Sequence, residues 1–224
     1  MELLLDTGNL HEIERCCAQY AVAGVTTNPS IMSKESADFF ELLRAIRGVI
    51  GREATLHVQT VGASTQEILR DADTLLDRVG SDTYIKIPTT AQGLTAMKQL
   101  KERGVHVTAT AVYSVSQALM AASVGADYIA PYFNRICNFG ADGAAEIARM
   151  AELYRVQGCK TKIVAASFKN IGQVIEALLA GAQAVTVPGE LLDQMTANPA
   201  IEQAVKNFRA DWDGRHGGRA ICEL

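Results

Sequence analysis

Segments with the pattern of β-strands alternate with helical segments along nearly the whole chain, and this alternation constrains the fold more than any other feature. No repeated antiparallel hairpin signal interrupts the series. Strands that alternate with helices of about 10–15 residues form parallel sheets. The expected strands are residues 2–6, 22–26, 54–60, 83–88, 105–110, 127–131, 161–166 and 183–187, and the expected helices are residues 9–20, 37–50, 64–79, 91–103, 114–124, 142–157, 170–180 and 189–196.

Eight strand–helix units in a chain of 224 residues predict a closed α/β structure, a (β/α)₈ TIM barrel. A doubly wound open sheet is the competing arrangement. It is disfavoured because no GxGxxG follows the first strand and no GxxxxGK[ST] occurs anywhere. We therefore expect one barrel domain over residues 1–224.

One further helix is expected at about residues 199–213, before a glycine-rich tail at 214–224 that is flexible by composition. Its apolar residues recur with helical spacing and form one stripe. A closed barrel already has its outer helices, so this stripe needs another surface. It folds either across its own barrel or onto a neighbouring subunit, with the only tryptophan as an anchor. The stripe consists of Ile201, Ala204, Val205, Phe208 and Trp212.

Composition excludes several classes of partner. The net charge of −4 gives no reason to expect a nucleic-acid or membrane-surface partner. The five cysteines lack CxxC spacing and suggest reduced thiols rather than a disulfide framework. The acidic N-terminus does not resemble a signal peptide, and no apolar run approaches the ~18 residues of a membrane span. These features are typical of a soluble cytoplasmic protein.

A lysine interrupts the apolar strand at residues 83–88. Lys86 stands between Ile85 and Ile87, although lysine is almost never fully buried without a partner. One interpretation is a lysine at a fraying strand end that reaches solvent or pairs with an acid. The other is a desolvated amine, whose lowered pKa would let it attack a carbonyl and form a Schiff base.

Polar side chains close to other strand ends favour the second interpretation. Carboxyl ends of barrel strands meet at one mouth, where active sites lie. Singly, such residues are explained as helix caps or as hydroxyls bonded to nearby backbone. Only the eighth strand, ending in Val187–Pro188, offers no polar side chain. Together around a lysine the others predict a site, made of Asp6, Thr26, Asn28, Gln59, Lys86, Thr110, Tyr132 and Ser167.

No metal ion or organic cofactor is expected in this site. The four histidines lack ligand spacing and are interpreted as surface or core residues. No histidine stands at a strand end to complete a Ser/His/Asp triad. A lysine nucleophile with carboxylate, phenol and amide neighbours suits carbonyl chemistry through an iminium ion.

The stretches that carry these polar residues resemble those of a known family. The resemblance runs in register over essentially the whole chain, and GVTTNPS followed at the right distance by KIP is a specific combination. The chain is similar to the transaldolase family, and within it to the small single-barrel branch of fructose-6-phosphate aldolases and short transaldolases. The matching stretches are Leu5–Thr7, Gly24–Ser30, Lys86–Pro88, Thr110–Ser114, Ala130–Arg135 and Ala165–Lys169.

The resemblance implies a role for each matching residue. Lys86 would be the Schiff-base lysine, and Asp6 would carry the proton of the hydroxyl beside the breaking carbon–carbon bond. Asn28 and Ser167 would hold hydroxyls of the ketose donor, with Thr26 supporting Asn28. Arg135 would face the phosphate of the acceptor aldehyde, which suits its planar guanidinium.

Two positions distinguish the activities within the branch. Transaldolases of the family carry glutamate where this chain has Gln59, beside Thr110, and commonly phenylalanine where it has Tyr132. A neutral amide cannot take a proton, so the phenol becomes the acid/base through a water. The pattern favours an aldolase that cleaves fructose 6-phosphate over a transaldolase of pentose phosphate metabolism. A non-catalytic sugar-phosphate binder is a third hypothesis, and binding alone needs no buried amine.

The resemblance also concerns assembly and specificity. Family members of this size form decamers of two pentameric rings, with the last helix on a neighbour, so a homo-oligomer is implied. Two residues depart from the aldolase pattern near the mouth. His57 replaces a large apolar residue, and Phe133 replaces a smaller aliphatic one. Phe133 either narrows the pocket or faces outward into packing.

Overall fold

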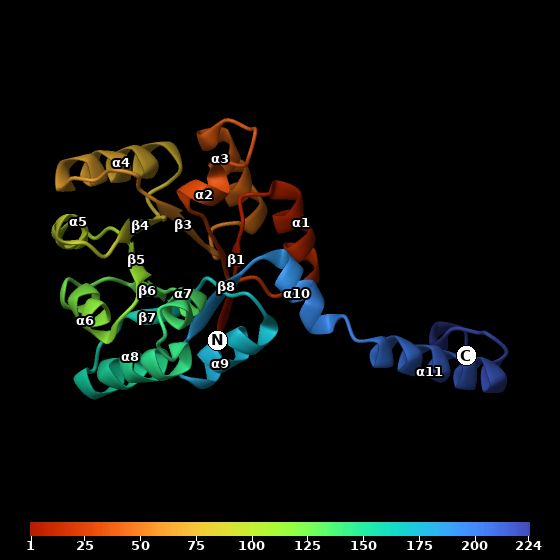
Figure 1. Ribbon diagram of the computed structural model, residues 1–224. Coiled ribbons are helices and arrows are strands. Elements are labelled where there is room, and N and C mark those ends of the chain that lie inside the picture. The colour runs from red at the N-terminus through yellow and green to blue at the C-terminus, as the bar shows by residue number, and fades with distance from the viewer. The chain divides into compact units, whose positions relative to one another are not determined.

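The computed structural model describes residues 1–224, and its central feature is a closed barrel of eight parallel strands in sequential order. The barrel closes where the first strand pairs with the last, with Leu4 opposite Thr186. The longer helices α1, α3, α4, α5, α6, α8 and α9 surround the strands (Figure 1). The predicted (β/α)₈ barrel is confirmed. The strands are β1 (Glu2–Asp6), β2 (Gly24–Thr26), β3 (Thr55–Gln59), β4 (Tyr84–Pro88), β5 (Val107–Val112), β6 (Tyr128–Pro131), β7 (Lys162–Ala165) and β8 (Ala184–Val187).

The helices include two that the sequence pattern did not predict, α2 and α7. Both are short and follow strand ends directly, so they shape the mouth of the barrel rather than its outer layer. The helices are α1 (Leu10–Gln19), α2 (Pro29–Met32), α3 (Phe39–Ile50), α4 (Thr65–Arg78), α5 (Ala91–Glu102), α6 (Val115–Ser123), α7 (Phe133–Asn138), α8 (Gly143–Gln157), α9 (Ile171–Leu179), α10 (Gly189–Thr196) and α11 (Pro199–His216), with a 3₁₀ turn at Ile221–Glu223.

Side-chain caps explain where many helices begin. Ser64 starts α4 with a reciprocal capping box to Glu67. Thr90 caps α5 and Ser114 caps α6 in the same position, each accepting from a backbone N–H three residues later. Since each cap follows a strand by a few residues, the strand–helix turns are short and hold the strand ends firmly around the mouth.

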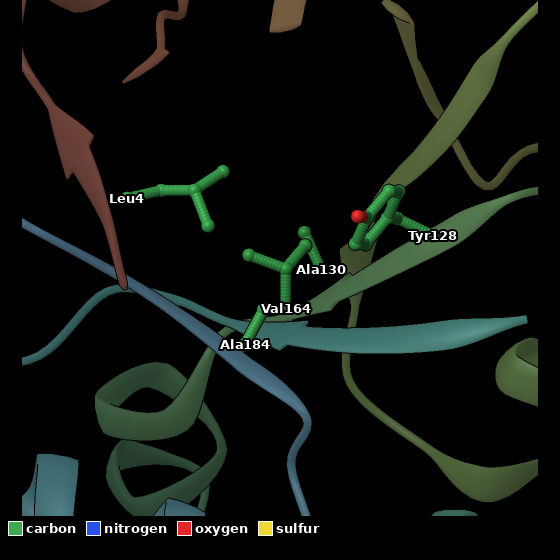
Figure 2. Close-up of a cluster of buried hydrophobic side chains, with 5 residues drawn as sticks. All are labelled: Leu4, Tyr128, Ala130, Val164 and Ala184. Atoms are coloured by element: carbon green, nitrogen blue, oxygen red, sulfur yellow. The ribbon is translucent and has the colours of Figure 1, made fainter. Parts of the chain in front are cut away.

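The barrel interior is filled by side chains at alternate strand positions. Leu4, Ala130, Val164 and Ala184 form a buried apolar cluster with Tyr128, and Figure 2 shows these side chains within the space that the strands enclose. The interior is therefore packed below the mouth, as in other closed barrels of this size.

Aromatic and polar side chains gather near the amino ends of the strands. The rings of His57 and His106 stack on Tyr84 at centroid distances of 4.7 and 4.6 Å. The hydroxyl of Tyr128 donates to Glu2 at 2.7 Å, and Lys162 donates to the other carboxylate oxygen of Glu2. This arrangement was not expected from the sequence, where the histidines were interpreted only as surface or core residues.

Two non-glycine residues at strand ends adopt left-handed backbone conformations. Ala111 has φ 56° and lies in β5 where the register with β6 shifts between Ala109 and Val112. Ser167 has φ 64° and follows β7. Because positive φ is costly for residues other than glycine, both positions store strain beside the mouth.

The chain divides into two compact units, Met1–Gly189 and Glu190–Leu224. The first contains the whole barrel. The second contains the predicted C-terminal helix as α11, which extends to His216, beyond the expected end at residue 213. That residues 1–224 form a single domain remains a prediction.

None of the helices is both long enough and apolar enough to span a membrane.

Candidate active site

A cavity of about 670 Å³ opens at the carboxyl ends of the strands. Seven of the nine predicted site residues line it. They are Asp6, Asn28, Gln59, Lys86, Tyr132, Arg135 and Ser167. The other two, Thr26 and Thr110, are fully buried directly behind the lining and reach it through hydrogen bonds. The sequence therefore located the cavity and seven of its polar lining residues, but not Ser30, Lys34, Tyr113, Lys169 or Thr186.

Lys86 is a buried amine that reaches the floor of this cavity. Its side chain is 3% exposed, and Nζ donates to the carbonyl oxygen of Thr27 at 3.2 Å. Desolvation lowers the pKa of the Lys86 amine, against which the nearby Asp6 carboxylate acts in the opposite sense. Lys86 therefore does not reach solvent at a fraying strand end, and its burial favours the neutral, nucleophilic form of the amine.

The close packing of α5 fixes the strand that carries the lysine. A Cβ added at Gly93 would lie 2.0 Å from the carbonyl oxygen of Pro88, so only glycine permits this approach. Thr90 precedes helix α5, and its hydroxyl accepts a hydrogen bond from the backbone N–H of Gly93. The end of β4 is therefore held by backbone contact.

Asp6 is held by a relay of two hydroxyls. Thr26 Oγ1 donates to Asp6 Oδ1 at 2.7 Å and shares a hydrogen bond with Thr186 Oγ1 at 2.8 Å. The prediction that Thr26 supports Asn28 is therefore wrong, since its hydroxyl serves the carboxylate. The expectation that the eighth strand contributes nothing is also wrong, because Thr186 lines the cavity. Strand alternation could have found it, since the inward position precedes Val187.

Asn28 follows β2, Ser167 follows β7, and both residues line the cavity. Asn28 is the N-cap of α2, and its Oδ1 accepts from the backbone N–H of Ile31. This bond fixes the side chain and leaves its Nδ2 to donate to a ligand. Asn28 therefore caps a helix and also lines the cavity.

Tyr132 and Gln59 provide neutral polar groups near the lysine. The Tyr132 hydroxyl shares a hydrogen bond of 2.9 Å with Thr110 Oγ1. Gln59 Oε1 is buried and has no hydrogen-bond partner within the chain. Because buried acceptors are almost always satisfied, this oxygen calls for a donor from a ligand or a bound water.

The outer part of the cavity is cationic. Arg135 lies over the ring of Tyr132 with its Cζ 4.9 Å from the centroid, and its Nη1 donates weakly to the Tyr113 hydroxyl at 3.5 Å. Lys34 and Lys169 also line the cavity, where the only acidic side chain is Asp6. A cleft with this imbalance attracts anionic ligands. The two lysines were not singled out from the sequence, because isolated surface lysines carry no pattern.

The two departures from the family pattern lie outside the lining. Phe133 is buried and packs on Phe168 with ring centroids 5.8 Å apart, so it does not narrow the pocket. His57 is fully buried inside the barrel. No group of three or more histidine, cysteine, aspartate or glutamate side chains is arranged to hold a metal ion.

Comparison with known proteins assigns the chain to a family. The model of the transaldolase/fructose-6-phosphate aldolase family matches residues 3–217. The chain belongs to this family. A relative from Streptococcus pneumoniae (strain ATCC 700669 / Spain 23F-1), named probable fructose-6-phosphate aldolase, is 43% identical over 222 residues, which cover 99% of this chain and 100% of the relative. Membership of this enzyme family confirms the resemblance predicted from the sequence motifs, and it makes the chain an enzyme of the aldolase and transaldolase group.

Several solved structures of other proteins are similar to this chain in fold only. Thiamine phosphate pyrophosphorylase from Pyrococcus furiosus superposes with a TM-score of 0.59 at 16% identity, over 83% of this chain and 85% of that one. A flavocytochrome b2 variant with bound sulfite superposes with a TM-score of 0.60 at 11% identity, over 84% of this chain. The chain spans 56% of that longer flavocytochrome chain. At such identities the likeness concerns the barrel alone.

Proposed function

We propose that the protein is a class I aldolase that reversibly cleaves fructose 6-phosphate to dihydroxyacetone and glyceraldehyde 3-phosphate. The observation that carries the proposal is a fully desolvated lysine beside a carboxylate, at the base of a cavity whose rim is cationic. A buried amine is unnecessary for binding a sugar phosphate but necessary for forming an iminium ion. The name of the 43% identical relative supports the same activity.

The first half of the proposed reaction breaks the sugar. Neutral Lys86 Nζ adds to the C2 carbonyl of the open-chain ketose, and loss of water gives the iminium ion. Asp6 takes the proton of the C4 hydroxyl while the bond between C3 and C4 breaks, and the electron pair of that bond moves into the iminium to give an enamine. Thr26 holds the Asp6 carboxylate in place through its 2.7 Å hydrogen bond.

The second half releases the donor fragment. The enamine carbon takes a proton, and water hydrolyses the resulting iminium ion to dihydroxyacetone and the free lysine. We assign the proton delivery to Tyr132 through a water that Gln59 and Thr110 help to hold. The unpartnered Gln59 Oε1 and the bond between Tyr132 and Thr110 support this assignment.

The remaining lining residues suit the substrate's hydroxyls and its phosphate. We assign Asn28 Nδ2 and the Ser167 hydroxyl to the hydroxyl groups of the ketose donor. The phosphate of the aldehyde faces Arg135, whose guanidinium can bind two phosphate oxygens. The proposed reaction needs no metal or organic cofactor, because the iminium ion formed on Lys86 accepts the electron pair of the breaking bond.

A transaldolase is the second candidate, since the family includes both activities. It would pass the enamine to an aldose phosphate instead of protonating it. The aldolase is favoured because Gln59 is a neutral amide that cannot take a proton, and because the Tyr132 phenol, which lines the same cavity, can protonate the enamine.

One assay separates these possibilities. Release of glyceraldehyde 3-phosphate from fructose 6-phosphate is measured with and without erythrose 4-phosphate. Sustained turnover without the acceptor supports the aldolase, and turnover only with the acceptor identifies a transaldolase. Lys86→Met should abolish both. If that variant binds fructose 6-phosphate as before and the parent shows no turnover either way, the protein is a non-catalytic binder.

We further propose a cytoplasmic homo-oligomer, a decamer of two pentameric rings. The family resemblance supports this assembly, with α11 packed on a neighbouring subunit. The stripe residues Ile201, Val205 and Phe208 are 55%, 59% and 70% exposed. Exposed apolar side chains arranged on one helix face favour a protein contact.

A further inference from the structure

A buried histidine inside the barrel has both ring nitrogens engaged by hydroxyl groups. His57 Nδ1 lies 2.7 Å from Thr108 Oγ1, and Nε2 lies 2.9 Å from Thr55 Oγ1. The ring stacks on Tyr84 and meets Tyr128 edge to face. Such a fully satisfied polar group in a dry interior is held in one orientation.

Strand register places the bond between His57 and Thr108 next to Lys86. His57 in β3 pairs with Tyr84, and Thr108 in β5 pairs with Lys86. His57 and Thr108 therefore lie on opposite sides of β4. The bond therefore crosses the inner face of β4 diagonally, between the two inward residues Tyr84 and Lys86. It forms the polar floor beneath the lysine side chain.

Burial, together with nearby positive charges, keeps the His57 imidazole neutral. Burial lowers the pKa of His57 to about 3, and the positive charges of Lys86, Arg47 and His106 act in the same direction. A neutral imidazole accepts at one nitrogen and donates at the other, and hydroxyl partners satisfy either tautomer. The floor thus adds no second positive charge next to the amine or to an iminium ion formed on it.

The alternative partner for the Thr108 hydroxyl is Lys86 itself. Thr108 stands directly beside the lysine on the neighbouring strand, and both side chains face the interior. A buried hydroxyl without its histidine would seek another partner, since leaving it unpaired is costly. A hydrogen bond from the amine to Thr108 would draw Nζ down, away from the cavity.

We propose that His57 is a positioning residue for Lys86, which occupies the Thr108 hydroxyl and so leaves the amine directed toward the cavity. The inference rests on the proposed role of Lys86 as the Schiff-base lysine. It adds a residue that touches no substrate yet controls the presentation of the nucleophile.

The test compares two replacements of His57. His57→Phe keeps an aromatic ring for the stack on Tyr84 but frees Thr108, whereas His57→Asn keeps a hydrogen-bonding group at the position of Nδ1. Adducts of dihydroxyacetone on Lys86 are trapped with borohydride and counted by mass spectrometry. We expect His57→Phe to slow trapping by about tenfold or more, because small displacements of a reacting atom are costly. His57→Asn should retain most of the parent rate.

A second substitution distinguishes positioning from a general loss of packing. In the pair His57→Phe with Thr108→Val the competing hydroxyl is gone, so trapping should recover to within about threefold of the parent. His106→Phe is the matched control, because His106 stacks on the other side of Tyr84 and has no bond to Thr108. It should trap at the parent rate. Thermal unfolding of each variant confirms that the fold is retained.

The outcomes separate this inference from the proposed function. Unchanged trapping in His57→Phe, or no recovery in the double variant, overturns the inference. If the parent itself forms no adduct, the proposed function fails, while the rate at which acetic anhydride acylates Lys86 still reports its presentation. In that case acylation that is equal in the parent and His57→Phe overturns the inference, and slower acylation in His57→Phe that recovers in the double variant supports it.

Discussion

Lys86 shows how a single residue can trade stability for reactivity. Its amine is removed from water and keeps one hydrogen bond, to the Thr27 carbonyl. The pKa of the amine is lowered in the folded chain. Between the folded and unfolded pKa values, the unfolded chain therefore binds a proton more readily than the folded chain does. Stability therefore rises with pH between the folded pKa and the unfolded value of about 10.4. Below that window the buried amine costs stability.

Replacing the lysine should thus stabilise the protein at neutral pH. Lys86→Met removes the desolvation cost and retains a long flexible side chain. We expect its free energy of unfolding to exceed that of the parent by about 1–3 kcal/mol at pH 7, a gap that narrows as the pH approaches ~10. Urea unfolding at several pH values measures this difference. A variant less stable than the parent at pH 7 would show that the amine contributes net stability.

At the scale of the element, β5 carries a strained turn next to the site. Ala111 has φ 56° at the register shift of β5, directly after Thr110, which bonds the Tyr132 hydroxyl. The bulge adds one residue and aims the strand end toward the mouth. Strain of this kind persists only because the surrounding barrel determines the backbone.

Substitutions at residue 111 should separate strain from chemistry. Ala111→Val places a β-branched residue at positive φ and should lower the free energy of unfolding by ~2 kcal/mol. It should also weaken turnover, because Thr110 and Tyr132 shift with the bulge. Ala111→Gly relieves the strain and should leave stability within about 1 kcal/mol of the parent. Thermal unfolding and steady-state assays measure both effects, and equal stability of the two variants would contradict the interpretation.

The elements also show what the sequence could and could not predict. The eight strands and their outer helices followed from the regular alternation of short apolar runs with longer helical patterns. Helices α2 and α7 were missed because they are only one or two turns long and immediately follow the strands. Thr186 was missed for a different reason: it points inward one residue before the end of β8, whereas Val187, which ends that strand, and Pro188, which follows it, are apolar. The hydrogen bond between Thr26 and Asp6 could not be predicted either, because it joins neighbouring strands. Sequence spacing does not show which of several nearby polar groups a side chain will bind.

At the scale of the whole molecule, a charged cluster joins three strands of the barrel. Glu2 in β1 accepts hydrogen bonds from Tyr128 in β6 and Lys162 in β7. These contacts reach past β8, where the first and last strands close the ring. Burial raises the pKa of the Glu2 carboxyl, but the bonds from Lys162 and Tyr128 outweigh it and hold the pKa below its usual value.

The charge of Glu2 should therefore contribute stability that disappears in acid. With the folded pKa lowered, the contribution is complete above about pH 5 and is lost as the pH falls through the folded pKa. Glu2→Gln should lower the free energy of unfolding by about 1 kcal/mol at pH 7, a modest value because solvent screens the pair. The difference should shrink toward pH 3.5. Exposed Glu53→Gln is the control, and an equal effect of the two variants in urea unfolding would exclude a special role for Glu2.

The second compact unit carries the apolar stripe that the sequence analysis left with two possible partners. Trp212 was expected to anchor the stripe, but its Nε1 donates to the carbonyl of Arg219 at 2.7 Å, and its ring packs on His216. The tryptophan thus binds the following turn of its own unit. The most exposed apolar side chain of the stripe is Phe208, at 70%. Phe208 is therefore the residue whose change should best report an intersubunit contact.

Sedimentation velocity of the full-length chain tests that contact. Phe208→Glu places a charge within the stripe and should split the assembly into smaller species, because burying an unpaired carboxylate is strongly unfavourable. Lys206→Glu, also exposed on α11 but outside the stripe, should leave the assembly unchanged. Truncation after Asn198 should act as Phe208→Glu does. If Phe208→Glu and the truncated chain both sediment like the parent, the assembly forms through barrel surfaces and α11 plays no part in it.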